Sequence, residues 1–439
     1  MKAWHGWTEA WLVAFLVLIP LSATVGPASL NVQWSDLAAG GFLISCAAGG
    51  WRRARGRPAL LGWAGAVYLA SQLPSFLQAA HPTASWIEFV KTGYVVGLGL
   101  AIAGWIKDPA TWDRLTAVFA AVVGALVVVS LGVFGYTRWS GHVPGGLAVL
   151  MPVPNVGEVL RVKATLYTPT LLANYLTMGV PLLAGYAAAR SPWPRATSWG
   201  ILLSGMLAAA TTASHSLAGY LVAAAVMAPR KARLDRIGQR IVSGLAAAVI
   251  VFALGATTVS VYGIQAPSVP ASNPPAAPAP HDFLGPQGTG EELTVRVRYA
   301  WVVYGLLKRF AWEAWQRHPW IGIGLGEFPH EVTKAFEAGR IHAYYAAGHD
   351  PHSTWLGAMA ETGLIGLTGL LGLWLALLSM YARAHGRLHR SPDGWRVLAP
   401  FAGLVGLAVN SPHVDIMHFR FLWVGAALLV AAVGSGSHS

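Results

Sequence analysis

A short segment with two histidines and an acid stands directly before an apolar stretch. Its polar residues are His349, Asp350 and His352. Ser353 follows, and a serine is well suited to cap the start of a helix. An imidazole in this position can take a proton from a hydroxyl near neutral pH. The three side chains are also metal ligands by type, but no further strong ligand is nearby in the sequence. In a third interpretation the histidines only hydrogen-bond the loop.

A second group of candidate residues consists of arginines in segments that we place outside the membrane below. Arginine stays charged and binds phosphate oxygens through two nitrogens, so several arginines on one face suit a diphosphate. The alternative is anchoring to anionic lipid, which is favoured for the two arginines beside tryptophans. For Arg161 and Arg298 both interpretations stay open. The group is Arg161, Arg296, Arg298, Arg309 and Arg317, of which Arg309 and Arg317 stand beside tryptophans.

Three alternating glycines follow the pair His318–Pro319. They are Gly322, Gly324 and Gly326. A dinucleotide-binding fingerprint requires a strand–turn–helix unit around such glycines, and the sequence shows none. The pattern therefore predicts a tight loop.

The composition is that of a helical membrane protein. The chain has 439 residues, of which 55% are apolar and only 11% charged, whereas soluble domains carry about 25% charged residues. These values exclude a disordered chain, a coiled coil and an ordinary soluble enzyme. The net charge of +12 would suggest a nucleic-acid partner in a soluble protein, but here we expect none, because the position of the charges matters more than their sum. The single cysteine, Cys46, excludes a disulfide framework and a cysteine-based zinc site.

Twelve stretches approach the ~20 apolar residues that a membrane-spanning helix needs. Near the outer end of the fourth, Glu88 and Lys91 stand one turn apart, and we expect them to pair. The stretches are 8–28, 36–50, 58–78, 87–106, 116–136, 168–189, 196–211, 214–229, 241–262, 361–382, 396–411 and 417–434.

Basic residues gather in alternate connections between these stretches, and the other short connections hold none. Because positive loops stay in the cytoplasm, the pattern predicts twelve helices with both termini cytoplasmic. We expect an all-α polytopic membrane protein.

Two connections on the outer side are long, 137–167 and 263–352. Residues 1–262 would then hold helices one to nine, and 353–439 helices ten to twelve. Between them, the proline-rich segment 265–286 reads as a flexible linker. We expect 292–352 to form an ordered helical lid over the outer end of the bundle.

Three segments resemble the O-antigen ligase family. His352–Ser353, nine further residues and then Gly363-Leu-Ile-Gly366 match the family's His-[Asn/Ser/Gln]-x9-Gly-x-x-[Gly/Thr/Tyr] motif. The stretch 311–328 resembles its His-Pro and Gly-x-Gly loop, and 169–176 its Asn-containing helix start. The resemblance covers most of 160–385 and also fits O-antigen polymerases and protein O-oligosaccharyltransferases. A departure lies at 212–216, where His215 stands in place of the family's arginine.

The resemblance implies a GT-C-like glycosyltransferase of a bacterial inner membrane, with its active site on the periplasmic face. It implies an undecaprenyl-diphosphate-linked glycan as donor, lipid A–core or another glycan as acceptor, and no metal or other cofactor. His352 would be the general base, with His349 in second rank. Arg298 and Arg161 would bind the diphosphate, with His215 in second rank. If Arg298 does not match the family's arginine, Arg296 or Arg309 does.

Other functions stay open at this stage. A polymerase would use a second carrier-linked glycan as acceptor, and a protein O-oligosaccharyltransferase a protein. A lipid or polysaccharide transporter is a more distant alternative. Transporters place their polar sites near the membrane midplane, whereas a transferase of this kind needs a cavity at the outer face.

Overall fold

The computed structural model describes residues 2–25, 32–48, 59–153, 157–227, 290–338, 348–388 and 392–435. This part is mostly helical, as the composition predicts, with 77% of the structure in helices. Its helices are α1 (Lys2–Leu18), α2 (Trp34–Ala48), α3 (Ala59–Gln78), α4 (Pro82–Trp105), α5 (Pro109–Ser140), α6 (Pro169–Ala188), α7 (Pro194–Ala210), α8 (Leu217–Met227), α10 (Gly290–Arg317), α11 (Phe328–Glu337), α12 (Thr354–Leu388), the short 3-10 helix η5 (Pro392–Gly394), α13 (Trp395–Asn410) and α14 (Arg420–Ser435).

Several of these helices are suited to a membrane. Five of them, α3, α4, α5, α6 and α12, are long and apolar enough to cross one. Large apolar side chains also remain on the outside of the bundle, including Trp63 and Leu77, which are 73% and 79% exposed. Exposed apolar surface of this extent is typical of contact with lipid. The chain is therefore a helical membrane protein, and the full set of twelve spans stays a prediction.

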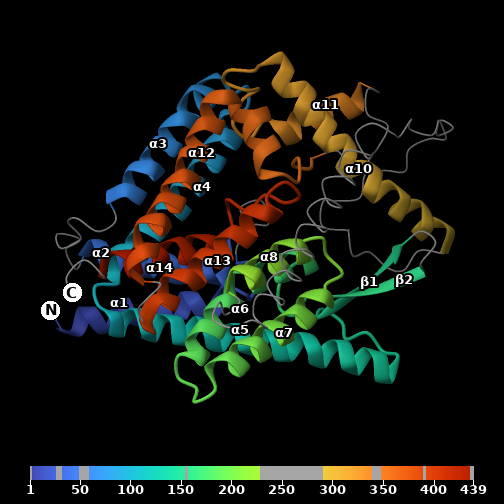
Figure 1. Cartoon of the computed structure of the whole chain (residues 1–439). Coiled ribbons are helices and arrows are strands. Elements are labelled where there is room, and N and C mark those ends of the chain that lie inside the picture. The colour runs from blue at the N-terminus through green and yellow to red at the C-terminus, as the bar shows by residue number, and fades with distance from the viewer. Residues whose placement is uncertain are drawn as a thin grey trace.

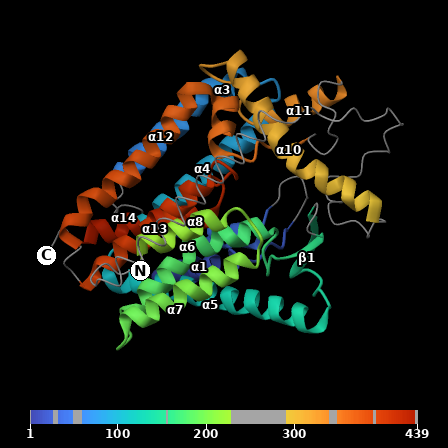
Figure 2. The same ribbon diagram turned by 45° about the vertical axis from the view of Figure 1, so that its right-hand side comes forward.

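The bundle has two distinct ends (Figure 1). The chain ends marked N and C lie at one side, and α10, α11 and a hairpin lie at the other. The hairpin consists of β1 (Ala148–Val153) and β2 (Gly157–Val162), which pair antiparallel. It lies within the long connection 137–167, for which the sequence did not predict strands. The turned view keeps α10 and the hairpin on the same side and keeps α3 beside α12 (Figure 2).

At the opposite end of the bundle, one carboxylate binds two arginines from other parts of the sequence. Asp113 in the first turns of α5 accepts hydrogen bonds from Arg396 of α13 at 3.0 and 3.1 Å and from Arg190 at 3.2 Å. Both arginines belong to the connections that we expect in the cytoplasm.

Helix α12 is broken at Gly363, whose φ of 62° and ψ of −160° are not helical. The break leaves backbone groups without helical partners, and the loop of alternating glycines supplies them. The amides of Leu364 and Ile365 donate to the carbonyls of Pro319 and Trp320 at 2.8 and 3.1 Å. In the other direction the amide of Ile323 donates to Ala360 at 2.9 Å.

The glycines at this contact have no room for a side chain. A Cβ on Gly363 would lie 2.4 Å from the carbonyl carbon of Trp320, and one on Gly322 would lie 2.2 Å from that of Glu361. All three loop glycines have positive φ, which confirms the tight loop predicted from the sequence. The glycine loop and the break at Gly363 are thus the two sides of one backbone contact.

This contact is covered by a small second core. The apolar faces of α10 and α11 pack there against the first turns of α12, through Leu307, Phe310, Phe328, Val332 and Ala360. The helical segments on both sides of the glycine loop are thereby fixed to the membrane helices. Two sequence predictions, the span 241–262 and the linker 265–286, lie outside the described residues.

We expect Gly363→Ala to destabilise the protein, because alanine adopts neither this backbone conformation nor this close approach. Strain of this kind costs on the order of 1–3 kcal/mol. The control is Gly372→Ala in the same helix, where a Cβ would meet nothing within 4 Å. Thermal unfolding in detergent should show a lower midpoint for the first variant alone. Equal midpoints for the two variants would contradict the role of the break.

Candidate active site

Four segments at the hairpin end of the bundle lie against one face of α10. They are the end of β2, the turn before α8, the segment before α12 and the segment between α13 and α14. Their side chains come from distant parts of the sequence, so the helices between them decide whether the groups meet. Two buried hydrogen-bond networks hold the turns in place.

The first network holds the turn before α8. Asn174 of α6 donates to the hydroxyl of Ser216 at 3.0 Å, and Asn410 of α13 donates to the side-chain oxygen of Asn174 at 2.8 Å. Asn410 also bonds to the Ser216 carbonyl and accepts from the amide of Gly219. Both asparagines are buried, so unsatisfied amides here would be costly. The asparagine found by sequence resemblance thus positions the turn that carries His215.

The second network joins the start of α12 to the segment between α13 and α14. The amide of Thr354 donates to the carbonyl of Ser411 at 2.9 Å, and its hydroxyl donates to the carbonyl of Val414 at 3.0 Å. Trp355 donates to the hydroxyl of Ser411 at 2.6 Å. Ser353 caps the helix by accepting from the amide of Leu356 at 3.3 Å, as the sequence predicts.

A group of basic side chains, which we call the cationic cluster, lies between these turns. Lys308 of α10 approaches His413, with 3.1 Å between Nζ and Nδ1. The rings of His413 and His215 have centroids 5.6 Å apart. Arg161 donates from Nε to the carbonyl of Thr212, at 3.0 Å, in the turn that carries His215. The cluster is Arg161, His215, Lys308, His352 and His413.

The basic groups of the cluster repel one another and are partly desolvated. His215 keeps accessible surface but is surrounded by protein, and this desolvation lowers its pKa to about 4, with the charges of Arg161, Lys308 and His352 acting in the same direction. Desolvation and the charges of Lys308 and His215 likewise lower the pKa of His413 to about 4. Desolvation lowers the pKa of Lys308 to about 8. Within the described residues no carboxylate pairs with Lys308, so an anion would relieve this repulsion.

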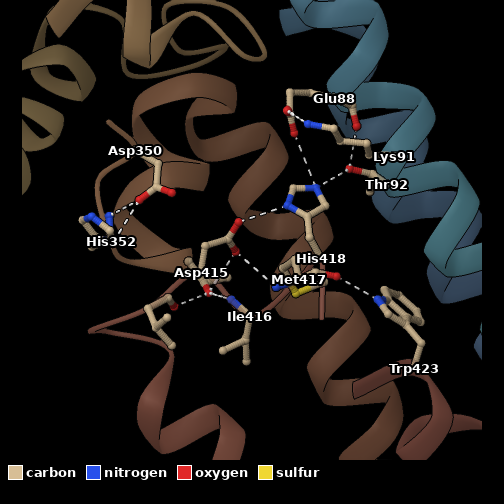
Figure 3. Close-up of polar contacts among 12 residues, drawn as sticks. Glu88, Lys91, Thr92, Asp350, His352, Asp415, Ile416, Met417, His418 and Trp423 are labelled. Carbon is tan, nitrogen blue, oxygen red and sulfur yellow. Dashed lines mark hydrogen bonds and ion pairs between the residues drawn. The ribbon is translucent and has the colours of Figure 1, made fainter. Parts of the chain in front are cut away.

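His352 stands at the edge of the cluster in an uncommon backbone conformation. Its φ is 47°, in the left-handed region that residues other than glycine seldom adopt. Asp350 holds it there by accepting from its backbone amide at 2.7 Å, and the same oxygen lies 3.4 Å from Nδ1 (Figure 3). The ring of Tyr304 meets the imidazole edge-on at 4.6 Å. Such strain is typical of functional sites.

Burial lowers the pKa of His352 below its ordinary value, against the opposing effect of Asp350. The imidazole is therefore neutral at pH 7 and able to accept a proton. With Asp350 beside Nδ1, Nε2 is the ring nitrogen left to accept a proton. His349 lies farther out, with its ring centroid 6.3 Å from that of His352.

A third polar network, centred on His418, lies on the side of the segment 350–354 that faces away from the cationic cluster (Figure 3). His418 contacts Asp415 at 3.2 Å and Glu88 at 3.5 Å, and Glu88 pairs with Lys91 at 2.7 Å, which confirms the pair predicted from the sequence. Burial alone would lower the pKa of His418, but the hydrogen bond and charge of Asp415 and the charge of Glu88 outweigh it and raise the pKa to about 9. This histidine is thus charged, in contrast to those of the cationic cluster.

The structure brings together three of the residues singled out from the sequence, Arg161, His215 and His352. Arg309 does not join them, because it is 62% exposed and pairs with Glu313. Arg296 and Arg298 belong to α10, but their side chains lie outside the described part of the structure. Within the described residues, no three His, Cys, Asp or Glu side chains are grouped to hold a metal ion.

Two members of the cluster were missed by the sequence analysis, Lys308 and His413. Arginines were considered as phosphate-binding side chains in the sequence, and Lys308 was not included. The spacing of Tyr304 and Lys308, one turn apart, places them on one face and is the signal that was available. His413 carried no local signal, since it stands alone in a short connection.

Comparison with known proteins adds no relative. No protein-family model matches the chain, and no curated protein matches it.

We expect Lys308→Met to weaken the binding of inorganic pyrophosphate by about tenfold to a hundredfold, because a hydrogen bond to a charged group contributes about 1.5–3 kcal/mol. The matched control is Arg309→Met on the exposed side of the same turn. Affinity for the wild type should also fall as the pH rises through about 8, where the unliganded Lys308 loses its proton. Lys308→Arg should abolish that fall. Equal effects of the two methionine variants would place the anion site elsewhere.

Proposed function

We propose that this protein is a membrane glycosyltransferase that takes a glycan from an undecaprenyl-diphosphate carrier and passes it to a sugar hydroxyl. In the form suggested by the sequence resemblance it is an O-antigen ligase acting at the periplasmic face of a bacterial inner membrane, with lipid A–core as acceptor. The observation that carries the proposal is the cationic cluster beside a neutral, strained His352. A diphosphate leaving group and a general base are the two requirements of this reaction.

The chemistry follows from the two halves of the site. The acceptor oxygen forms a bond to the anomeric carbon of the donor sugar, and the bond from that carbon to the diphosphate oxygen breaks. His352 takes the proton of the attacking hydroxyl, and Asp350 stabilises the resulting imidazolium. Arg161 and Lys308 stabilise the negative charge that develops on the departing diphosphate. No nucleotide sugar is required, since the carrier already supplies an activated glycan.

The position of the site supports transfer rather than transport. The polar side chains of the cluster come from the turns that connect the helices and from α10, at the hairpin end of the bundle. A transporter of the common kind places its polar groups near the midplane, on broken helices. In the described part of the chain, α12 is broken at Gly363, and there the glycine loop forms hydrogen bonds with the freed backbone groups, which are therefore not open to a substrate.

The decisive experiment offers purified protein in lipid nanodiscs a carrier-linked glycan with one of two acceptors. Transfer to lipid A–core supports a ligase. Elongation of a second carrier-linked glycan supports a polymerase. If neither acceptor is modified and the carrier is not bound, the proposal fails.

We expect His352→Ala to reduce turnover by roughly 10²–10⁴-fold, the usual contribution of a general base. Carrier binding should persist, because the arginine and lysine of the cluster remain. His142→Ala, an exposed histidine of the outer connection 137–167, serves as the control and should keep full activity. Near-normal turnover of the His352 variant would remove it from the base role.

The pH profile of turnover offers a separate test through Asp350→Asn. The active base is the neutral imidazole, so activity falls as the pH drops through the pKa of His352. Asp350 raises that pKa, and its removal should therefore move the acid limb to lower pH. Turnover at the plateau should fall as well, because the imidazolium loses its partner. An acid limb that stays in place, or moves upward, would show that another group titrates.

A further inference from the structure

The proposed mechanism leaves a large cavity unused. It has a volume of about 820 Å³ and lies among α3, α4, α12 and the start of α14. This size is within the usual range for sites that hold small ligands. It reaches the backbone on both sides of His352, because Asp350, Pro351 and Ser353 are among its lining residues. The segment that carries His352 thus separates the cavity from the cationic cluster.

Carboxyl groups outnumber basic side chains in the wall of this cavity, whereas the cationic cluster consists of basic side chains alone. Five carboxyl groups face four basic side chains there, those of Lys91, His330, His418 and Arg420. Three of the four are already paired: Arg420 with Asp36 at 2.6 Å, Lys91 with Glu88 at 2.7 Å, and His418 with Asp415 at 3.2 Å. An anion could bind to any of these three only by breaking its pair. The carboxyl groups are those of Asp36, Glu88, Asp350, Glu361 and Asp415.

The wall also offers groups suited to an uncharged polar ligand. Gln72 of α3 is 3% exposed, and its side-chain oxygen finds no hydrogen-bond partner in the described part of the protein. A buried acceptor of this kind costs about 1–3 kcal/mol unless a ligand satisfies it. Tyr94 and Phe419 add aromatic surface beside the carboxylates. A purely apolar chain would leave the Gln72 oxygen and the remaining acceptor positions of the carboxylates without hydrogen bonds, whereas sugar hydroxyls can donate to them.

From this cavity, its excess of carboxyl groups and the unpartnered side-chain oxygen of Gln72, we infer a binding subsite for the acceptor, and we infer that the acceptor is a neutral, hydroxyl-bearing saccharide without phosphate at the bound sugars. The word acceptor rests on the proposed function, whereas the saccharide site does not. Asp350 connects the two regions, since it lines the cavity and holds His352 at the edge of the cationic cluster. The donor's diphosphate and the acceptor's sugar would therefore approach His352 from opposite sides.

The test uses two photoreactive probes that differ in one group, a neutral trisaccharide and the same trisaccharide carrying a phosphate. Each is irradiated with full-length protein in nanodiscs, and the labelled peptides are identified by mass spectrometry. We expect the neutral probe to label the cavity peptides of α3, α4 and the segment 415–421, about tenfold more than the phosphorylated probe does. Labelling elsewhere, or equal labelling by the two probes, would overturn the inference.

Three variants sharpen this test. Gln72→Leu should reduce labelling by the neutral probe about tenfold, whereas Leu77→Ala, on the exposed side of α3, should not change it. Glu88→Gln should reduce the discrimination against the phosphorylated probe, because it leaves Lys91 unpaired. Lys91→Gln should increase that discrimination. An unchanged preference in both charge variants would also count against the site, provided that both unfold at the wild-type temperature.

The two proposals fail in different ways. Labelling of the cavity without any glycan transfer or diphosphate binding would keep the saccharide site and reject the glycosyltransferase. Transfer that proceeds normally in Gln72→Leu, with no labelling of the cavity in the wild type, would keep the glycosyltransferase and reject this subsite.

Discussion

The left-handed backbone of His352 is held by hydrogen bonds on both sides. Asp350 accepts from the amide of His352 itself, and Thr354 is joined to the segment between α13 and α14 through its amide and its hydroxyl. The amide of Ile416 donates a hydrogen bond to the hydroxyl of Thr354 at 3.0 Å. Because α13 and α14 are fixed in the bundle, this set of bonds determines where the imidazole points. The cationic cluster on one side and the cavity on the other are both defined by that segment.

Desolvation has different outcomes for the histidines on the two sides of the segment that carries His352. In the cationic cluster it adds to the repulsion between basic groups, so that the histidines are neutral and Lys308 holds its proton weakly. Around His418 the neighbouring carboxylates outweigh it, so that this histidine is charged. The same residue type therefore serves as a proton acceptor in one place and as part of an ion pair in the other. Such a division of charge suits an enzyme that binds an anionic leaving group and a neutral nucleophile.

The sequence predicted the parts of the structure that depend on local pattern. Hydropathy indicated the helices, the alternating glycines indicated a tight loop, and Ser353 indicated a helix start. The resemblance also brought Arg161, His215 and His352 into one proposal, and they do lie in one cluster. What the sequence could not provide were contacts between distant segments. His413 and Lys308 meet only because α10 packs on the start of α12. The break at Gly363 is stabilised by hydrogen bonds from the glycine loop, which is distant in the sequence. The hairpin was missed because its strands are short and lie in a connection without a clear alternation.

In the proposed mechanism, the cationic cluster holds the diphosphate of the donor. A cryo-electron microscopy structure of the protein with an undecaprenyl-diphosphate-linked sugar would test it most directly. We expect the two phosphates within hydrogen-bond distance of Arg161 and Lys308, and the first sugar beside His352. Phosphates bound instead among the carboxylates around Glu88 and Asp415, or far from His352, would contradict the account.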